Sequence, residues 1–312
     1  MTGLVVQNKA ISIENNLAMP TPKAGEVVVQ IKYASVHSFD LENIEGKNDL
    51  IAKLMGAKKY PVRTGIEFSG MVTTDGARFK KGDEVFGYPD LIKGTKAHQQ
   101  YIAINENLMA PMPANLGFEQ SCALPVGALT SLAALEALGK VTPGANALIN
   151  GAAGGLGVYA VQLAKILNAT VTAVAGPGQE AFLKELGANK VVDYKKQRLQ
   201  DLNDRFDVVF DLTAKVKFAA VKQLLKPKGV FVPANPFNAL LPIMGNALRK
   251  KKVGYLMVDK GNYNELARIA QWVEQGKLKP IVDSTYPFAD YQKAFDRTLQ
   301  PNKRGRIVMK ME

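Results

Sequence analysis

The residues with the clearest chemical potential form a glycine-rich run at 151–157, Gly-Ala-Ala-Gly-Gly-Leu-Gly. A short apolar run of strand type at 147–149 precedes it, and an amphipathic helix follows it. Gly154 and Gly157 occupy the last two glycines of the dinucleotide-binding pattern G-x-G-x-x-G, and Ala152 replaces the first. Such a turn lets the backbone approach a pyrophosphate, and the helix N-terminus adds N–H groups and a positive dipole end. The run predicts dinucleotide binding, with a glycine-rich turn that holds no ligand as the alternative.

The flanking sequence predicts a parallel sheet that would carry this turn. Apolar runs rich in β-branched residues alternate there with helical stretches. Strands are expected at 147–149, 170–175, 190–194, 206–212 and 229–233, and helices at 179–186 and 216–225. Strands that alternate with helices at this spacing indicate a doubly wound α/β sheet, and near-continuous apolar strands fit a sheet that is covered on both faces.

The rest of the chain has a different character. Residues 2–105 are expected to be mainly β, because short strand-like runs are broken by frequent Gly and Pro, which suggests a small barrel-like domain. These runs lie at 26–33, 65–72, 79–87 and 99–104. Helices are expected at 117–138, 264–276 and 291–299, a loop-rich insertion at 235–261, and a final strand at 305–310.

Composition bounds the class of protein. The 312 residues are enough for two domains, and 47% hydrophobic and 22% charged residues are ordinary for a globular enzyme. We expect no membrane span, since no apolar run near 18 residues is evident, and we see no signal-peptide core. The single cysteine, Cys122, precludes an internal disulfide and favours a cytoplasmic setting. The net charge is +12, and the small groups of basic residues are expected to be scattered solvated faces, although a positive field would also help to attract an anionic cofactor. No recognisable module supports nucleic-acid binding.

Several short motifs follow one another in a specific order. They lie at 22–29, 34–40, 65–70, 81–87, 123–130, 151–157 and 305–308. With them the chain resembles the medium-chain dehydrogenase/reductase superfamily, in particular its zinc-free quinone oxidoreductase branch. The run at 276–287 is similar to the subgroup of reticulon-4-interacting and chloroplast-envelope reductases. The resemblance implies a GroES-like β-barrel domain from residues 1–115 and 270–312, a Rossmann domain from 116–269, and a homodimer formed by edge strands of the Rossmann sheets.

The resemblance also bears on zinc. Zinc members of the superfamily hold the metal with Cys, His and a second Cys or a Glu, and the matching positions here are His37, Ile66 and Val126. Because a site needs at least three protein ligands, we predict no metal, with a remnant pair of His37 and Glu67 as the alternative. Without a metal to polarise the substrate oxygen, alcohol oxidation is difficult. Hydride attack on a quinone or conjugated enone is easier, because the acceptor carbon is already electron-poor.

The second expected strand bears on the choice of nicotinamide cofactor. A site that prefers NAD usually places an acid at the end of this strand, and none is present at 174–178, which favours NADPH, with NADH as the alternative. Many quinone reductases carry Lys or Arg in this loop, and the matching residue here is Gln179, so Gln179→Glu is expected to weaken NADPH binding. Tyr194 matches a tyrosine near the adenosine phosphate, and the candidate charges are Lys195, Lys303 and Arg304. The expected cofactor contacts are Ala152, Ala153, Gly154, Gly155, Leu156, Ala175, Gly176, Gln179, Tyr194, Thr213, Ala234 and Asn235.

Three residues are expected to act in catalysis. Some quinone reductases carry an asparagine and, five residues later, a tyrosine, where this chain has His37 and Glu42. A histidine titrates near neutrality, so His37 either donates a proton to the substrate or only packs and bonds the cofactor amide. We expect His37→Ala to reduce turnover and spare cofactor binding. Thr130 matches a threonine beside the nicotinamide, although it could equally be an ordinary helix position, and Asp40 is expected to be structural.

The predicted function is zinc-independent transfer of hydride from NAD(P)H to quinones or α,β-unsaturated carbonyl compounds. Two alternatives remain open, a zinc-free alcohol or ketone dehydrogenase and a non-catalytic NADPH-binding sensor or interaction protein. The insertion at 236–252 either shapes the substrate pocket or forms a dimer contact.

Overall fold

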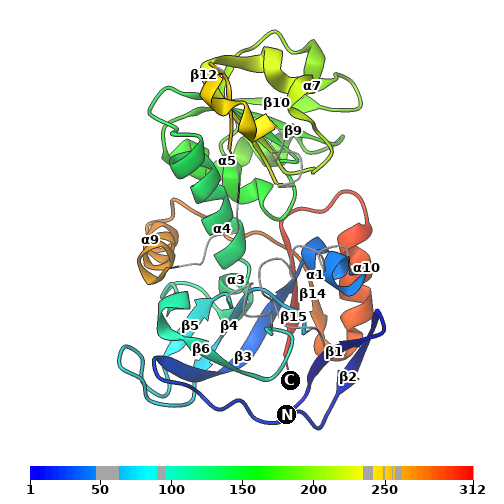
Figure 1. Ribbon diagram of the computed structural model, residues 1–312. Helices are drawn as coiled ribbons and strands as arrows, with labels where there is room; N and C mark the ends of the chain where they lie inside the picture. Colours follow the sequence, from blue (N-terminus) through cyan, green and yellow to red (C-terminus); the bar gives the residue numbers. More distant parts are fainter. Residues whose placement is uncertain are drawn as a thin grey trace. The chain divides into compact units, whose positions relative to one another are not determined.

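The computed structural model describes residues 1–46, 63–89, 96–234, 242–248, 250–254, 256 and 262–311. The chain divides into two compact units, Met1–Val126 with Lys260–Glu312, and Gly127–Asp259 (Figure 1). The first unit therefore takes both ends of the chain, as the resemblance implied. Its boundaries differ from the predicted ones, because residues 116–126 and 260–269 belong to the first unit instead of the second.

Two helices explain the shifted boundaries. α3 (Phe118–Ser121) packs against the sheet of the first unit, where the Ser69 hydroxyl donates to the Phe118 carbonyl over 2.6 Å. α9 (Tyr263–Glu274) lies beside β7 (Met109–Pro111), and Glu274 accepts a hydrogen bond from Ala114 N at 2.9 Å. The buried face of α9 is apolar (Leu266, Ile269, Ala270 and Val273), and sequence periodicity cannot tell which neighbouring unit such a face covers.

The first unit is built on a seven-stranded sheet in the order β14-β15-β3-β4-β5-β7, with β6 also paired to β3. The strands are β3 (Glu26–Val36), β4 (Phe68–Val72), β5 (Glu84–Gly87), β6 (Tyr101–Asn105), β7, β14 (Val282–Pro287) and β15 (Arg306–Lys310). Neighbours are antiparallel except for the parallel pair β14 and β15. A hairpin of β1 (Gly3–Gln7) and β2 (Ala10–Glu14) forms a separate sheet, and α1 (Ser38–Ile44) and α10 (Tyr291–Leu299) complete the unit.

The second unit is a parallel six-stranded sheet in the order β10-β9-β8-β11-β12-β13. Its strands are β8 (Asn146–Asn150), β9 (Thr170–Ala175), β10 (Lys190–Asp193), β11 (Phe206–Asp211), β12 (Leu225–Pro233) and β13 (Lys252–Val253). Numbered along the chain this is the order 3-2-1-4-5-6 of dinucleotide-binding folds, so the predicted doubly wound sheet is confirmed. Its described helices include α5 (Gly157–Ile166), α6 (Glu180–Glu185) and α7 (Phe218–Val221), and β13 lies inside the insertion that was expected to be loop-rich.

A helical stretch with three parts joins the two units in sequence. It consists of α3, α4 (Pro125–Leu132) and a π-helical turn at Ala133–Leu138. By length and composition alone, Phe118–Leu138 is apolar enough to cross a membrane, contrary to the expectation that no such run exists. However, 78% of its apolar window is buried inside the protein, as expected of a core helix.

Candidate active site

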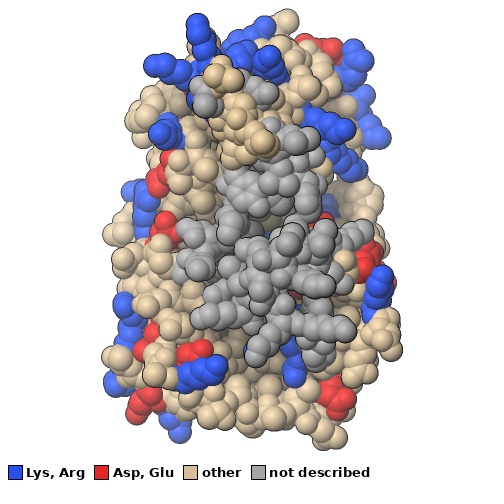
Figure 2. All heavy atoms as spheres, in the orientation of Figure 1, with Lys and Arg blue, Asp and Glu red and all other residues tan. Residues whose placement is uncertain are grey.

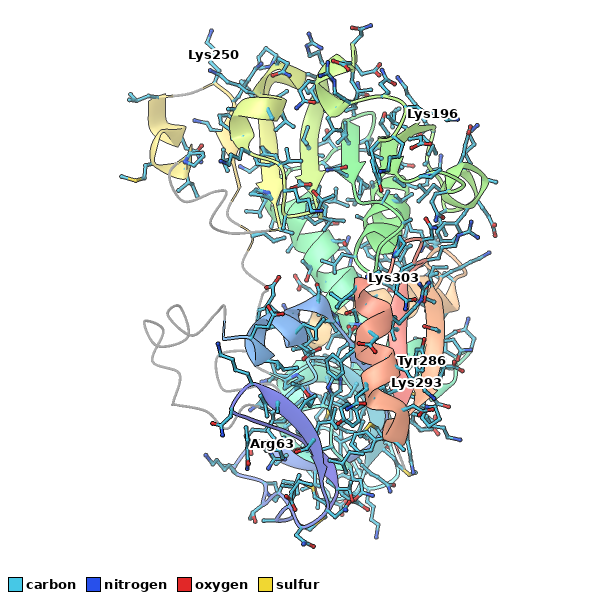
Figure 3. All side chains as sticks on the ribbon, turned by 90° about the vertical axis from the view of Figure 1, so that its right-hand side faces the viewer. Arg63, Lys196, Lys250, Tyr286, Lys293 and Lys303 are labelled. Atoms are coloured by element: carbon cyan, nitrogen blue, oxygen red, sulfur yellow. The ribbon has the colours of Figure 1, made fainter. Side chains whose placement is uncertain are left out.

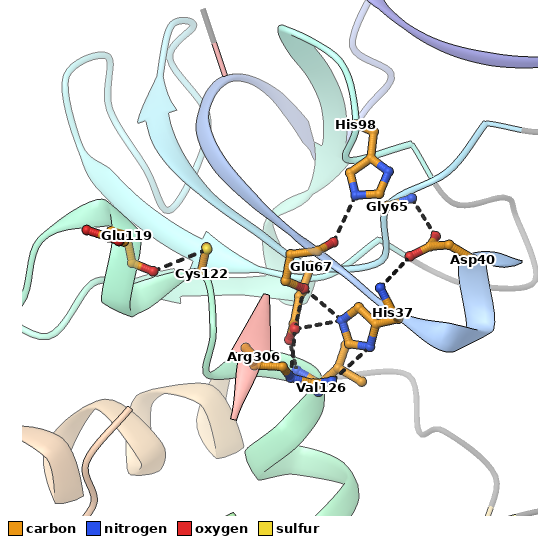
Figure 4. Close-up of polar contacts among 10 residues, drawn as sticks. His37, Asp40, Gly65, Glu67, His98, Glu119, Cys122, Val126 and Arg306 are labelled. Carbon is orange, nitrogen blue, oxygen red and sulfur yellow. Dashed lines mark hydrogen bonds and ion pairs between the residues drawn. The ribbon is translucent and has the colours of Figure 1, made fainter. Parts of the chain in front are cut away.

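A polar cluster forms in the first unit where three segments meet (Figure 4). β3 ends at Val36, and His37 follows at the start of α1. β15 runs antiparallel to β3 with Ile307 opposite Val36, which brings Arg306 beside His37. Glu67 directly precedes β4, which pairs with β3 along its other edge. Sheet pairing thus collects three side chains that lie far apart in the sequence.

His37 has both ring nitrogens engaged. Arg306 Nη1 donates to Nδ1 over 2.9 Å, while Nε2 lies 2.7 Å from Glu67 Oε1 and 2.7 Å from Ser35 Oγ. Because a guanidinium can only donate, Nδ1 must accept, and the ring proton therefore sits on Nε2 and faces Glu67. The residue is 6% exposed, so His37 is held as the neutral Nε2–H tautomer between partners of opposite charge.

Glu67 is the anionic centre of the cluster. It is fully buried and accepts further hydrogen bonds from Ser35 Oγ at 2.5 Å and from Val126 N at 2.6 Å, with Arg306 Nε 3.2 Å from its Oε1. Burial alone would raise the pKa of Glu67, but its electrostatic and hydrogen-bond interactions with Arg306, His37 and Ser35 outweigh burial and lower this pKa to about 2. Glu67 is therefore the ionised counter-ion of Arg306 at neutral pH.

Asp40 and His98 hold the backbone around the cluster. Asp40 accepts hydrogen bonds from the N–H groups of His37 at 3.0 Å and Gly65 at 2.8 Å, so its expected structural role is confirmed. His98 Nε2 donates to the Ser35 carbonyl over 2.8 Å, and its other nitrogen bonds a threonine hydroxyl. Burial lowers the pKa of His98, which keeps this ring neutral.

The donor set does not fit a catalytic zinc. Within the described ranges no three His, Cys, Asp or Glu side chains come together in a way that could hold a metal. His37 and Glu67 bond each other directly, and the Arg306 guanidinium contacts both, so a second cation would lie against an existing one. Ile66 and Val126, at two positions where zinc enzymes have ligands, offer apolar side chains that are 3% exposed each.

The second unit gathers the predicted cofactor residues at one edge of its sheet. These residues directly follow, or end, its parallel strands: Ala152, Ala153, Gly154, Gly155 and Leu156 after β8, Ala175 and Gly176 at β9, Tyr194 after β10, Thr213 after β11 and Ala234 after β12. The strand order reverses between β8 and β11, and ligands of such sheets bind at the carboxyl ends beside this switch point. Asn235, which was also predicted, lies outside the described residues.

Backbone hydrogen bonds fix the glycine-rich turn. Gly151 N and Ala152 N both donate to the Val174 carbonyl at 3.0 Å, and Gly154 N donates to the Gly151 carbonyl at 3.1 Å. Gly157 opens α5, and a Cβ there would lie 2.5 Å from the Ala152 carbonyl oxygen and still closer to that of Gly151. The start of α5 therefore approaches the turn after β8 so closely that no side chain fits at position 157. Val158 N and Tyr159 N, in the first turn of α5, donate to the Gly154 and Leu156 carbonyls at 3.1 Å each. The positive dipole end of α5 faces the turn and suits an anion.

The expected adenosine end of the site is also brought together. A Cβ on Gly176 would meet the Tyr194 ring at 3.5 Å, and Tyr194 N donates to the Ala175 carbonyl at 3.1 Å. Lys195 Nζ stands 5.7 Å from the centre of the Tyr194 ring. Gln179, the residue before α6, is 5% exposed, whereas Lys195 is exposed. Lys195 is thus the better placed of the two for a phosphate group.

The remaining predicted residues divide between the units. Thr130 of the second unit is 3% exposed, and its hydroxyl has no hydrogen-bond partner within the described part of the chain. A buried hydroxyl of this kind can hydrogen-bond a ligand or a water molecule. Glu42 lies on α1 with an exposed side chain, outside the His37 cluster. Lys303 and Arg304 belong to the first unit, where Lys303 Nζ donates to the Thr298 carbonyl.

Sequence reasoning missed Arg306, Ser35 and Asp211. One signal in the sequence could have indicated Arg306: it is a charged residue directly before the apolar run Ile307–Met309, and it is 4% exposed. Asp211, at the end of β11, accepts hydrogen bonds from Asn150 Nδ2 at 2.8 Å and Thr213 Oγ1 at 2.7 Å. It thereby orients Thr213 at the sheet edge. The contacts of these residues depend on strand neighbours that the sequence does not specify.

Two family models match the chain. The alcohol dehydrogenase GroES-like domain matches residues 23–137, and zinc-binding dehydrogenase matches residues 186–309. Among curated proteins, the chain is 32% identical over 291 residues to 2-methylene-furan-3-one reductase of Solanum lycopersicum, covering 89% of this chain and 69% of that protein. It is 29% identical over 310 residues to the chloroplast envelope quinone oxidoreductase homolog of Arabidopsis thaliana, covering 93% and 91%.

A solved structure agrees in fold over the whole chain. The quinone oxidoreductase from Coxiella burnetii superposes with a TM-score of 0.89 at 25% sequence identity, covering 100% of this chain and 99% of that one. The GroES-like and Rossmann-type units, their strand orders and these relatives agree with the expected architecture. The chain therefore belongs to the medium-chain dehydrogenase/reductase superfamily of oxidoreductases.

Proposed function

We propose that this protein transfers hydride from NADPH to quinones or α,β-unsaturated carbonyl compounds without a metal. The observation that carries the proposal is the carboxyl edge of the 3-2-1-4-5-6 sheet, where the glycine-rich turn, Gly176, Tyr194 and Thr213 come together. The relatives support the choice of acceptor, because a 2-methylene-furan-3-one carries a C=C bond conjugated to a ketone. Quinone reduction is named for the Arabidopsis and Coxiella proteins.

Different residues of this chain would contact different parts of the cofactor. The start of α5 would hold the pyrophosphate, Thr130 Oγ1 would meet the nicotinamide end, and Lys195 beside Tyr194 would meet the adenosine end. The bound cofactor supplies the hydride. We propose zinc independence because the Arg306 guanidinium already neutralises Glu67 where a metal would be needed.

NADPH and NADH oxidation, followed side by side by absorbance, test this proposal. The acceptors are a small quinone and a small enone, without added metal and with a chelator present. We expect chelator-insensitive oxidation of NADPH with at least one acceptor. NAD(P)⁺-dependent oxidation of alcohols in place of this activity would favour the alcohol dehydrogenase alternative. A clear NADPH-binding titration with no turnover would favour a sensor.

His37 is proposed to position the site instead of donating a proton, because its single N–H already faces Glu67 and Ser35. We therefore expect His37→Asn to keep turnover within about five-fold of the wild type, whereas loss of a general acid costs roughly 10²–10⁴-fold. The measurement is kcat between pH 5.5 and 8.5 for both proteins. An acid–base limb near neutrality that disappears in His37→Asn, with a large loss of kcat, would make His37 the proton donor after all.

Cofactor preference is proposed to depend on Lys195. We expect Lys195→Gln to raise the KM for NADPH about ten-fold and to leave the KM for NADH unchanged, because a charge-assisted contact to the 2′-phosphate is lost. Lys190→Gln is the control, since Lys190 begins β10 and its ammonium pairs with Asp204 at 2.6 Å. Equal effects of Lys195→Gln on both cofactors would remove Lys195 from the phosphate site.

A homodimer and a cytoplasmic location remain predictions. Among the described strands, β10 and β13 lie at the edges of the Rossmann-type sheet, and either edge could offer backbone groups to a second copy. Light scattering of the purified chain measures the oligomeric state.

A further inference from the structure

Glu67 differs in its burial from most charged side chains in the described part of the chain. Figure 2 shows Lys, Arg, Asp and Glu side chains on the face of the molecule that it presents, and Figure 3 shows exposed lysines such as Lys196 and Lys293. The exposed fraction of Glu67 is 0%. A buried carboxylate needs hydrogen bonds at both of its oxygens, so the partners of each oxygen indicate what Glu67 does.

The two carboxylate oxygens of Glu67 contact different parts of the structure (Figure 4). Oε1 lies 2.7 Å from His37 Nε2, 2.5 Å from Ser35 Oγ and 3.2 Å from Arg306 Nε. Oε2 accepts a hydrogen bond from Val126 N at 2.6 Å. Val126 is the second residue of α4, where a backbone N–H has no intrahelical acceptor and where the helix dipole favours a negative charge. Oε1 therefore belongs to the charged cluster, whereas Oε2 holds the start of α4.

A second hydrogen bond holds the other end of α4. Ser131 is 0% exposed, and its hydroxyl donates to the Leu156 carbonyl over 3.1 Å. Leu156 ends the glycine-rich turn and directly precedes α5, so this bond attaches α4 to the proposed pyrophosphate site. Thr130 lies between the two attachments, because it follows Val126 by four residues, about one helical turn, and directly precedes Ser131. A shift at either end of α4 therefore moves Thr130.

We propose that Glu67 and Ser131 are positioning residues, which hold the two ends of α4 and thereby fix the Thr130 hydroxyl for the nicotinamide. This inference rests on the proposed function, in which Thr130 Oγ1 meets the nicotinamide end of the cofactor. That hydroxyl is buried and has no hydrogen-bond partner in the described residues, so its place depends on the backbone of α4. Because a misplacement of about 1 Å can cost about 10²-fold in rate, turnover should respond to small movements of α4.

Double-mutant cycles with Thr130→Val, which removes the hydroxyl at nearly constant shape, test the proposal. Ser131→Ala removes the bond to the glycine-rich turn. Glu67→Asp keeps the charge beside Arg306 but withdraws the carboxylate from α4 by one methylene. We expect each of these two variants to lower kcat for NADPH oxidation about ten-fold when Thr130 is present, and less than about two-fold in the Thr130→Val protein. Equal losses in both backgrounds would show that neither residue acts through Thr130 and would overturn the proposal.

Thr298→Val is the matched control for the loss of a buried hydroxyl. Thr298 is 7% exposed, and its hydroxyl donates to the Phe295 carbonyl over 2.6 Å within α10. We expect a melting temperature lowered to the same extent as in Ser131→Ala, with kcat close to that of the wild type. If Ser131→Ala also keeps the wild-type kcat, its bond to Leu156 is structural only and the proposal is wrong. This comparison decides the outcome by itself if Glu67→Asp does not fold.

Two further measurements distinguish a failure of this inference from a failure of the proposed function. Hydrogen exchange of the backbone at 124–132 should be about ten-fold faster in Ser131→Ala and Glu67→Asp, because each variant loses one bond that holds α4. The emission of bound NADPH arises from its nicotinamide and supplies the same cycle without turnover. If the wild type binds NADPH but transfers no hydride, the proposed function is wrong. An emission change that Ser131→Ala causes only when Thr130 is present then still supports positioning, whereas an identical change in both backgrounds overturns it.

Discussion

Glu67→Gln is expected to lower the free energy of unfolding by about 3–5 kcal/mol, because it leaves the buried Arg306 without its counter-ion. Arg306 is 4% exposed, and its Nε lies 3.2 Å from Glu67 Oε1. Glutamine has the same shape, so the loss would report charge and hydrogen bonding instead of packing. The melting temperature should fall by roughly 6–20 °C, as measured by calorimetry together with urea unfolding.

A double variant distinguishes the cost of an unpaired Arg306 charge from a general loss of packing. Glu67→Gln with Arg306→Met removes both charges and should recover more than half of the stability lost in Glu67→Gln, since replacing a whole buried pair is far milder than breaking it. Glu180→Gln is the surface control, because Glu180 and its partner Lys184 are both exposed, and no measurable change in stability is expected there. If Glu67→Gln melts like the wild type, the pair contributes nothing to stability.

The same pair predicts sensitivity to acid. The pKa of Glu67 is about 2 in the fold against an ordinary value of 4.5, so its contribution is present above about pH 4.5 and is lost as the pH falls through 2. This difference corresponds to about 3 kcal/mol at 1.36 kcal/mol per pH unit. Unfolding free energies measured from pH 5 to pH 2 should therefore decline less steeply in Glu67→Gln. Parallel curves for the two proteins would contradict this account.

Gly157→Ala is expected to weaken NADPH binding at least about 100-fold. The added Cβ would lie 2.5 Å from the Ala152 carbonyl oxygen and closer still to that of Gly151, so α5 must move away from β8. Movement of the turn by a fraction of an ångström misplaces the N–H groups that would hold the pyrophosphate. Overpacking should also cost about 1–3 kcal/mol of stability. The measurements are a fluorescence titration with NADPH and a thermal melt.

Gly154→Ala is the matched comparison, because a Cβ there would lie 3.4 Å from the Gly151 carbonyl oxygen. The melting temperature of Gly154→Ala should stay close to that of the wild type, and any loss of NADPH affinity in it would report direct contact with the cofactor. Wild-type NADPH affinity in Gly157→Ala would indicate a turn that holds no ligand, the alternative that the motif alone left open.

The parts of the fold that depend on local patterns could be predicted from the sequence. β9 and α10 span the expected residues 170–175 and 291–299, because β-branched runs and amphipathic periods are properties of neighbouring residues. The unit boundary near α9 was predicted less well. Amphipathicity shows that a helix has an apolar face but does not show which unit covers that face.

The chemical role of His37 could not be predicted from the sequence either. Its residue type left two roles open, a proton donor and a residue that only packs and hydrogen-bonds, and the structure places Arg306 against one ring nitrogen and Glu67 against the other. This arrangement depends on the antiparallel pairing of β15 with β3, across 269 residues of sequence. No local signal specifies such a pairing.

The sequence by itself determined the dinucleotide-binding turn, its place between a strand and a helix, the alternation that yields the parallel sheet, and the family. These features follow from residue types at short spacing, and short spacing is what turns and periodic elements require. Only the tertiary structure decided that Glu67 is kept ionised beside Arg306 and that both ring nitrogens of His37 are engaged. Burial, protonation and surface patches depend on which distant segments become neighbours, and that is settled by packing of the whole chain.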